Sequence, residues 1–239
     1  MCNMQNKYAV VVGASRGIGQ AVAITLSRKG FRTVLVGRSK EGLEETAAIC
    51  KQHQESKVIN GDITSNMSEI VSGVQSITSS ISVLWLGAAG FSEEPASRIA
   101  SSSIRELIRS GFESLVELVH HLYPLLAEGR GHVIGACSDW SDFLSGGPSV
   151  FGSTKVALAG FLDKLRAEAK SDGIQVTALK MGNVANTQGF GLGETERQIQ
   201  ETGTSLVALE DVCAAIEFII SRRTGNISEM TLIPADLDR

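Results

Sequence analysis

A glycine-rich turn is the first group of residues whose types and spacing point to chemistry. It reads Gly13-Ala14-Ser15-Arg16-Gly17-Ile18-Gly19 and lies between an apolar run and a segment of helical period. Glycine tolerates positive φ and lets backbone N–H groups approach an anion closely, and a helix N-terminus adds a partial positive charge. The position of the turn after the first strand favours a dinucleotide pyrophosphate as the anion. A strand-to-helix turn without a ligand would use glycines as well.

The end of the second apolar run indicates which nucleotide such a site selects. The segment Val36-Gly37-Arg38-Ser39 offers no carboxylate where an NAD site binds the ribose 2′-OH, whereas Arg38 and Arg16 can pair with a 2′-phosphate. The sequence therefore predicts NADPH, although two solvated surface arginines would give the same pattern. Asp62 stands where a carboxylate accepts the adenine amino hydrogens, with a turn-forming Asp as the alternative. Ser39 and Ile63 are placed in the same nucleotide site.

The elements that must position these residues follow from short apolar runs that alternate with longer segments of helical period. This alternation is typical of βαβ units and of a parallel sheet covered on both faces. We expect strands at Tyr8–Val12, Arg32–Val36, Lys57–Ile59, Val83–Leu86, His132–Ala136, Gln175–Lys180 and Met230–Ile233. We expect helices at Gly17–Lys29, Lys40–His53, Met67–Ile77, Ser103–Ala127, Gly152–Ser171 and Leu209–Ser221, with the Ser-rich piece Ala100–Ser103 as a loop that caps the fourth. The sequence predicts a single α/β domain over residues 1–239, a Rossmann-like doubly wound sheet of about seven parallel strands with helices on both faces.

The composition excludes several classes of protein. The 239 residues carry 22 Lys+Arg against 26 Asp+Glu, a formal charge of −4, so no nucleic-acid partner is expected. The hydrophobic fraction of 43% supports a buried core and rules out disorder. Four cysteines lie far apart without a histidine pair nearby, so no metal site is expected. No signal-peptide pattern and no apolar run long enough to span a membrane occurs, so we expect a cytoplasmic protein with no membrane partner.

Further segments resemble the short-chain dehydrogenase/reductase family, and the resemblance covers essentially the whole chain. The family's glycine turn matches at Gly13, Gly17, Ile18 and Gly19, and its Asn-Asn-Ala-Gly segment falls on Gly87-Ala88-Ala89-Gly90. Its active-site Ser falls on Ser138, in Cys137-Ser138-Asp139-Trp140, and the Lys of its Tyr-x-x-x-Lys motif falls on Lys155. The resemblance implies that the cofactor is also bound by Ala88, Ala89, Gly90, Lys155, Gly182 and Val184.

The chain departs from the family pattern at the catalytic tyrosine. The motif reads Phe151-Gly152-Ser153-Thr154-Lys155, so the lysine is present and the tyrosine is not. The helix Asn that the family uses to hold a proton-relay water falls on Ser110, and the family's Pro-Gly after the sixth strand is Met181-Gly182. These losses leave the fold and the cofactor site intact and change the expected acid–base chemistry.

The missing phenol decides which reaction the site favours. Hydride addition to an isolated ketone forms an alkoxide that needs a proton as the charge develops, and loss of a general acid typically costs about 10²–10⁴ in rate. Hydride addition to the far carbon of an α,β-unsaturated carbonyl forms an enolate instead, which hydrogen-bond donors stabilise and water protonates later. We therefore predict an NADPH-dependent C=C reductase with Ser138, Phe151 and Lys155 at its centre. In it, Ser138 donates to the carbonyl oxygen and Lys155 holds the nicotinamide ribose.

Family members with Phe at this position are similar to reductases in bacterial pathways from prephenate to anticapsin (bacilysin) or to the Choi unit of aeruginosins. The resemblance implies a dihydro-4-hydroxyphenylpyruvate-like or alkenal substrate in specialised-metabolite biosynthesis, with the aeruginosin type favoured. Three alternatives stay open: a carbonyl reductase with another proton donor, an engineered Tyr-to-Phe variant of a carbonyl reductase, and a pseudoenzyme that only binds NADPH.

The surroundings of the reacting atoms are also predicted. Trp140, Phe143 and Phe190 are expected to line a substrate pocket, with the polar stretch Gly182–Thr204 as its cover. The two longest helices carry apolar residues on more than one face, and this predicts packing against a second subunit in a homodimer or homotetramer. The residues behind that prediction are Leu107, Leu115, Leu118, Leu122, Val156, Leu158, Phe161 and Leu165.

Overall fold

The computed structural model describes residues 7–139, 147–185, 206–222 and 224–235. Its strands are β1 (Tyr8–Val12), β2 (Arg32–Gly37), β3 (Ser56–Asn60), β4 (Val83–Leu86), β5 (His132–Ser138), β6 (Gln175–Met181) and β7 (Glu229–Leu232). Its helices are α1 (Gly17–Arg28), α2 (Lys40–Cys50), α3 (Met67–Ile77), α4 (Ser101–Ile108), α5 (Ser114–Gly129), α6 (Ser149–Glu168) and α8 (Leu209–Ile220), with a π-helical segment η2 (Arg109–Glu113) between α4 and α5.

The strands form one parallel sheet in the order β3-β2-β1-β4-β5-β6-β7. The strand order reverses between β1 and β4, which makes this the switch point where ligands of doubly wound sheets bind, at the carboxyl ends of the strands. The predicted fold class, a Rossmann-like doubly wound α/β sheet of seven parallel strands, is therefore confirmed.

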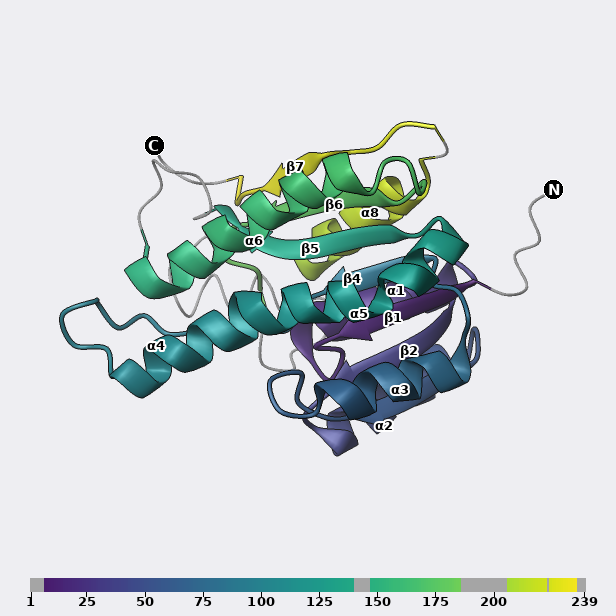
Figure 1. The fold of residues 1–239 in the computed structure, drawn as a ribbon, viewed down its shortest axis with the longest axis horizontal. Helices are drawn as coiled ribbons and strands as arrows, with labels where there is room; N and C mark the ends of the chain where they lie inside the picture. The colour runs from purple at the N-terminus through teal and green to yellow at the C-terminus, as the bar shows by residue number, and fades with distance from the viewer. Residues whose placement is uncertain (1–6, 140–146, 186–205, 223, 236–239) are drawn as a thin grey trace.

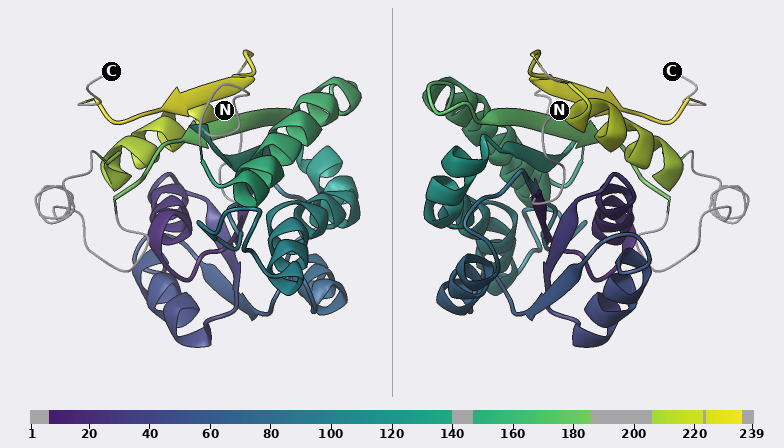
Figure 2. Two further views of the ribbon diagram at one scale, coloured as in Figure 1. Left: turned by 90° about the vertical axis from the view of Figure 1, so that its left-hand side faces the viewer. Right: turned by 90° about the vertical axis from the view of Figure 1, so that its right-hand side faces the viewer.

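Helices cover both faces of the sheet because its central strands are apolar on both sides. In Figure 1, α3, α5 and α6 lie in front of the sheet and α1, α2 and α8 lie behind it, and the side views of Figure 2 separate the two layers. Alternate residues of β4 serve the two cores: Leu84 and Leu86 pack with the front layer, and Val83 and Trp85 pack with the rear layer. Both cores hold the carboxyl ends of β1, β4 and β5 in place.

Two of the predicted helices begin at other residues than expected. The Ser-rich piece expected to be a loop is the first turn of α4, which follows Ala100 without a side-chain cap among the described residues. The sixth helix begins at Ser149 rather than at Gly152, since Pro148 is extended and its carbonyl accepts the Gly152 N–H at 2.8 Å. Position 151 therefore lies in the first turn of α6, on the same helix as Lys155.

The long helix predicted over Ser103–Ala127 is interrupted by η2. A π-helical turn inside a longer helix often marks a functional site, because it shifts the side chains that follow and loosens the backbone ladder. At Gly111, within η2, an added Cβ would lie 2.9 Å from Thr154 Oγ1, so the absence of a side chain lets this segment pack directly on α6. In Figure 1, α4 and the start of α6 project beyond the carboxyl ends of the strands.

The apolar side chains that predicted a second subunit are mostly used within the chain itself. Leu107, Leu115, Leu118, Leu122, Leu158 and Leu165 are all buried in the single chain. Val156 and Phe161 are half-buried. These leucines therefore do not indicate a surface for a second subunit, and the argument that used them was wrong. The homodimer or homotetramer stays a prediction.

Within the described part of the chain, no helix has the length and apolar character needed to cross a membrane. Across the same residues, no group of three or more His, Cys, Asp or Glu side chains is arranged to hold a metal ion.

Candidate active site

The glycine-rich turn crosses the carboxyl ends of β1, β2 and β4. Gly13 has φ +82° and Gly17 has φ +57°, conformations that favour glycine. The Gly13 and Ala14 N–H groups donate to the Val36 carbonyl at 2.9 and 3.2 Å, and this ties the turn to the end of β2. A Cβ on Gly13 would lie 3.1 Å from the Ala88 nitrogen, so the turn also rests on the loop after β4.

The N-terminus of α1 has the properties of an anion site. Arg16 is its extended N-cap residue, and within the described residues no side chain caps the helix and no acidic residue stands in its first turn. Because first-turn N–H groups have no partner inside a helix, they are available to a phosphate. A side chain on Gly19 would overlap the Gly13 carbonyl, so this residue holds the helix against the turn. Ser15 and Ile18 are half-buried in the same turn.

The residues predicted to select the nucleotide meet at the ends of β2 and β3. Arg38 Nη1 lies 3.8 Å from Asp62 Oδ2, and the Arg38 side chain is 70% exposed. Asp62 Oδ1 accepts hydrogen bonds from the Thr64 N–H and hydroxyl, both at 2.8 Å. Asp62 is thus a turn-forming residue and an Arg38 partner at once. The exposed Arg38 guanidinium keeps most of its donors available to a ligand.

Two other predicted nucleotide residues have structural roles in this region. The Ser39 hydroxyl accepts the Gly42 N–H at 3.2 Å and caps α2. Ile63 is buried among the apolar side chains of the front layer. The sequence missed Asn60, whose amide donates to the Gly37 and Arg38 carbonyls at 3.1 and 2.9 Å and fixes the backbone that presents Arg38. A polar residue at the end of β3 was the available signal.

The loop after β4 is tied to the π-helical segment. The Gly90 N–H donates to the Ser110 hydroxyl at 3.0 Å, and that hydroxyl donates to the Glu106 carbonyl at 2.8 Å. Ser110, the residue on which the family's helix Asn falls, therefore links α4–η2 to the segment expected to bind the cofactor. Ala88 is half-buried and Ala89 is exposed there.

Lys155 is the buried cation of the site. Its Nζ donates to the Ala136 carbonyl at 2.9 Å, near the end of β5. Burial lowers the pKa of Lys155, although the Cys137 thiol opposes the shift. The same burial raises the pKa of Cys137 to about 11, so this thiol stays protonated and is not a nucleophile.

Phe151 stands where the proton donor was expected. Its ring packs edge-on against Phe91, with centroids 4.9 Å apart and an interplanar angle of 83°. The Lys155 Nζ lies 5.5 Å from the centroid of the Phe151 ring. The lysine that would accompany a phenol is thus positioned beside an apolar ring.

Ser138 ends β5 and is buried, and its hydroxyl donates to Asp139 Oδ1 at 3.1 Å. Gly182 follows β6, and its N–H donates to the Leu232 carbonyl at 2.8 Å. A Cβ on Gly182 would lie 3.5 Å from Asp139 Oδ2, so the Asp139 carboxylate faces the end of β6. Val184 forms a parallel bridge with Val207. The sequence placed Ser138 here and missed Asp139, although the two are neighbours in the chain.

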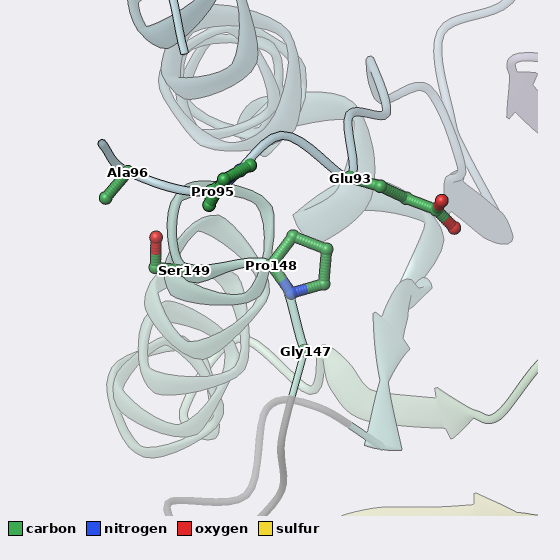
Figure 3. Close-up of a pocket in the computed structure, with 6 residues that line it drawn as sticks. All are labelled: Glu93, Pro95, Ala96, Gly147, Pro148 and Ser149. Atoms are coloured by element: carbon green, nitrogen blue, oxygen red, sulfur yellow. The ribbon is translucent and has the colours of Figure 1, made fainter. Parts of the chain in front are cut away.

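The predicted pocket residues Trp140, Phe143 and Phe190 lie outside the described residues, as does most of the predicted cover Gly182–Thr204. A pocket of ≈ 470 Å³ is lined by Glu93, Pro95, Ala96, Gly147, Pro148 and Ser149. Figure 3 shows the Pro95–Ala96 segment running alongside the start of α6.

The sheet order and the glycine turn at the switch point define the Rossmann-like class of folds. Within this class, the chain belongs to the short chain dehydrogenase family, whose model matches residues 7–197. The family resemblance of the sequence is thereby confirmed at the level of the family.

Curated relatives cover the chain almost completely. An uncharacterized oxidoreductase of Staphylococcus epidermidis is 27% identical, in a match that covers 98% of this chain and 100% of the relative. Serine 3-dehydrogenase of Agrobacterium fabrum is 26% identical, in a match that covers 95% of this chain and 93% of that protein.

Solved structures share the fold at lower identity. L-Sorbose reductase from Gluconobacter frateurii, complexed with NADPH and L-sorbose, superposes with a TM-score of 0.85 at 20% identity and 98% coverage of both chains. An alcohol dehydrogenase from Thermococcus sibiricus, complexed with 5-hydroxy-NADP, gives 0.84 at 21% identity and 95% coverage of both.

Proposed function

We propose that this protein is an NADPH-dependent reductase that adds hydride to the conjugated C=C bond of an α,β-unsaturated carbonyl compound. One observation carries the proposal: Phe151 occupies the proton-donor position while Lys155 keeps its place and its hydrogen bond to β5. A site that keeps its buried cation and lacks its acid suits a reaction whose transition state needs charge stabilisation more than proton transfer.

The residues present fit NADPH. The uncapped N-terminus of α1 and the positive-φ glycines form a turn that a pyrophosphate can approach. Gly37 presents no carboxylate to a 2′-phosphate, and Arg38 is exposed beside it. The NADPH and 5-hydroxy-NADP complexes of the two structural neighbours support the same cofactor. Bound NADPH would supply the hydride.

The chain's own residues would then stabilise the electron-rich product of addition. Negative charge spreads from the attacked carbon to the carbonyl oxygen, where the Ser138 hydroxyl is the donor. Lys155 holds the ribose and contributes positive potential from a buried position, in which Coulomb interactions are weakly screened. Phe151 and Phe91 present apolar surface to the substrate carbons.

The resemblance to Tyr-lacking family members extends the proposal to a substrate class. We infer a dihydro-4-hydroxyphenylpyruvate-like compound or an alkenal, reduced in specialised-metabolite biosynthesis of the aeruginosin Choi type. Trp140, Phe143 and Phe190 remain the proposed aromatic lining.

A carbonyl reductase is the second candidate. It is favoured by the names of the relatives, a serine 3-dehydrogenase, an alcohol dehydrogenase and an L-sorbose reductase. In this case a proton must come from a group other than residue 151. A protein that binds NADPH without turnover is a third outcome.

A matched substrate panel separates these candidates. NADPH oxidation is followed with an enal, an enone and a dienyl pyruvate, and with the saturated aldehyde, ketone and pyruvate of the same carbon skeleton. Consumption of only the unsaturated members supports the proposed function. Consumption of the saturated members favours the carbonyl reductase, and cofactor binding without consumption of any member favours the binding protein.

A further inference from the structure

Trp85 carries a buried hydrogen-bond donor that the described part of the chain does not use. Its side chain in β4 is fully buried, and within the described residues the indole Nε1–H has no hydrogen-bond partner. Buried indole N–H groups usually have a partner, because a donor that is removed from water and left unpaired destabilises the folded state. A ligand that brings an acceptor to this nitrogen would therefore be bound more tightly.

The position of the nitrogen in the fold indicates which ligand this is. A Cβ on Gly87 would overlap Trp85 Nε1, so the indole nitrogen occupies the space of a side chain at residue 87. The Gly87 N–H donates to the Val12 carbonyl at 3.2 Å, and a Cβ on Gly13 would lie 3.1 Å from the Gly87 carbonyl carbon. Only the Gly87 backbone thus separates this donor from the first glycine of the glycine-rich turn.

Trp85 also lies on the face of the sheet that α1 covers. It belongs to the rear core together with Ala14 of the glycine-rich turn and with Val22 and Ala23 of α1. The N-terminus of α1 is the anion site described above, so the indole and this site share one side of the switch point. The pyrophosphate and ribose oxygens of a dinucleotide are acceptors, and they bind at such a place.

The departure from the family segment at residue 87 supports the same interpretation. The family has Asn at this position, and the side-chain amide of Asn is a hydrogen-bond donor. This chain has Gly87, and the Trp85 indole puts an N–H into the space that the Asn side chain would fill. The Trp85–Gly87 combination therefore keeps a donor at the carboxyl end of β4.

We propose that Trp85 is a cofactor-binding residue, whose indole N–H donates to a pyrophosphate or ribose oxygen of bound NADPH or NADP⁺. The nitrogen is shielded from solvent and the Gly87 backbone lies against it, so the contact forms when the Gly87 segment shifts as the cofactor binds. A glycine permits such a shift because its backbone has a wide conformational range. This role depends on the cofactor and not on the reaction proposed above.

NMR of the indole N–H groups tests this contact on the unaltered protein. The chain has two tryptophans, Trp85 and Trp140, and the Trp140→Phe protein identifies the resonance of Trp85. NADP⁺ is the probe, because it binds without transferring hydride. We expect the Trp85 indole proton to move downfield as NADP⁺ saturates the protein, the direction that a new hydrogen bond gives. A Trp85 resonance that stays in place or moves upfield at saturation overturns the proposal.

The dissociation constant of NADP⁺ measures what the donor contributes. Trp85→Phe keeps an aromatic ring in the core and removes the N–H, so we expect binding to weaken by about tenfold, the effect of one net hydrogen bond. Leu84→Val is the matched control, since it truncates the preceding residue of β4, which packs in the front layer. This control should keep the wild-type dissociation constant in a calorimetric titration.

The outcomes separate this inference from the proposals on which it borders. Equal affinity of the wild type and Trp85→Phe for NADP⁺ overturns the role of Trp85 alone. No binding of NADP⁺ by the wild type overturns the cofactor assignment together with it. Failure of the proposed reaction leaves both binding results as expected, because it is seen only as unsaturated compounds that the protein does not consume.

Discussion

The Lys155 ammonium lies 5.5 Å from the centroid of the Phe151 ring, one helical turn away on α6. In a site with a phenol at position 151, this cation would favour the phenolate and lower the pKa of the donor. Here it faces a ring with no proton, and its own Nζ is held by the Ala136 carbonyl. The site therefore keeps the positive potential of Lys155 and lacks the phenol that would act as its acid.

Phe151→Tyr should restore ketone reduction. The new hydroxyl would lie near the Lys155 ammonium and supply the missing proton, so we expect the rate with a saturated ketone to rise by about 10²-fold or more. The rate with the matching enone should change by less than tenfold, because its transition state depends less on an acid. Steady-state NADPH oxidation with both substrates measures the ratio.

The control for this substitution is Phe161→Tyr, which adds the same hydroxyl farther along α6, where the side chain packs against the front core. It should leave the ketone-to-enone ratio unchanged. A Phe151→Tyr protein that gains no ketone activity while it still binds NADPH would count against the role assigned to position 151.

Gly37→Asp should shift cofactor preference from NADPH toward NADH. A Cβ at Gly37 would lie 3.4 Å from Leu43 Cδ2 and 3.6 Å from Ser15 Oγ, which are ordinary contacts, so the side chain fits. The carboxylate would accept from the ribose hydroxyls and repel a 2′-phosphate, and a charged hydrogen bond contributes about 1.5–3 kcal/mol. We expect the ratio of the two dissociation constants to change by roughly 10–100-fold.

Gly37→Ala controls for the added volume and should keep the NADPH preference. Titration of the reduced cofactors by their fluorescence gives both constants. Unchanged preference in Gly37→Asp would mean that this edge of the sheet does not meet the ribose.

Gly13→Ala should weaken both the fold and cofactor binding. The residue has φ +82°, and an added Cβ would lie 3.1 Å from the backbone after β4. The left-handed conformation alone costs an L-residue about 1–2 kcal/mol. Thermal unfolding and the NADPH dissociation constant measure the two effects.

Gly160→Ala is the matched control for this substitution, since no atom lies within 4 Å of a Cβ built at that helical position. It should stabilise the protein by up to about 1 kcal/mol through helix propensity. Equal stability of the two variants would contradict the strained conformation of Gly13.

His132 should make the protein less stable as the pH falls. It is buried at the start of β5, where its Nε2 lies 2.7 Å from Thr177 Oγ1, and burial lowers the pKa of His132 to about 4. The unfolded chain has the ordinary value of 6.5, so it binds more protons between pH 6.5 and pH 4. Stability is therefore full above pH 6.5, falls below it, and levels off near pH 4.

The loss due to this histidine reaches at most about 3.5 kcal/mol, from ~1.4 kcal/mol for each unit of pKa difference. Urea unfolding at a series of pH values measures it. His132→Gln should flatten this part of the profile, whereas substitution of the exposed His120 by Gln should not. A profile that is flat in the wild type would show that His132 is not buried in its neutral form.

The strands and their order could be predicted because the central strands are buried on both faces and read as short apolar runs. The β1 and β4 boundaries agree with the prediction at every residue. The start of α6 could not be placed, since the turn before it depends on the conformation of Pro148. This displacement matters because it carries Phe151 into the helix that holds Lys155.

The site was predicted less completely because side-chain orientation decides its contacts. Gly87 replaces the first Asn of the family segment, and the fold explains why. A side chain at Gly87 would overlap the buried indole of Trp85, which lies two residues earlier in the chain. The contact between Ser138 and Asp139 depends likewise on side-chain rotamers at the end of β5, which residue spacing does not encode.

The central claim is that hydride is transferred to the β carbon of the conjugated C=C bond and not to the carbonyl carbon. The position of a deuterium label in the product tests this claim most directly. Cofactor carrying deuterium at the transferred position is incubated with an enone that the protein consumes, and the product is examined by NMR. We expect deuterium on the carbon β to an intact carbonyl. An allylic alcohol with deuterium on the carbon that bears the hydroxyl would contradict the proposed C=C reduction.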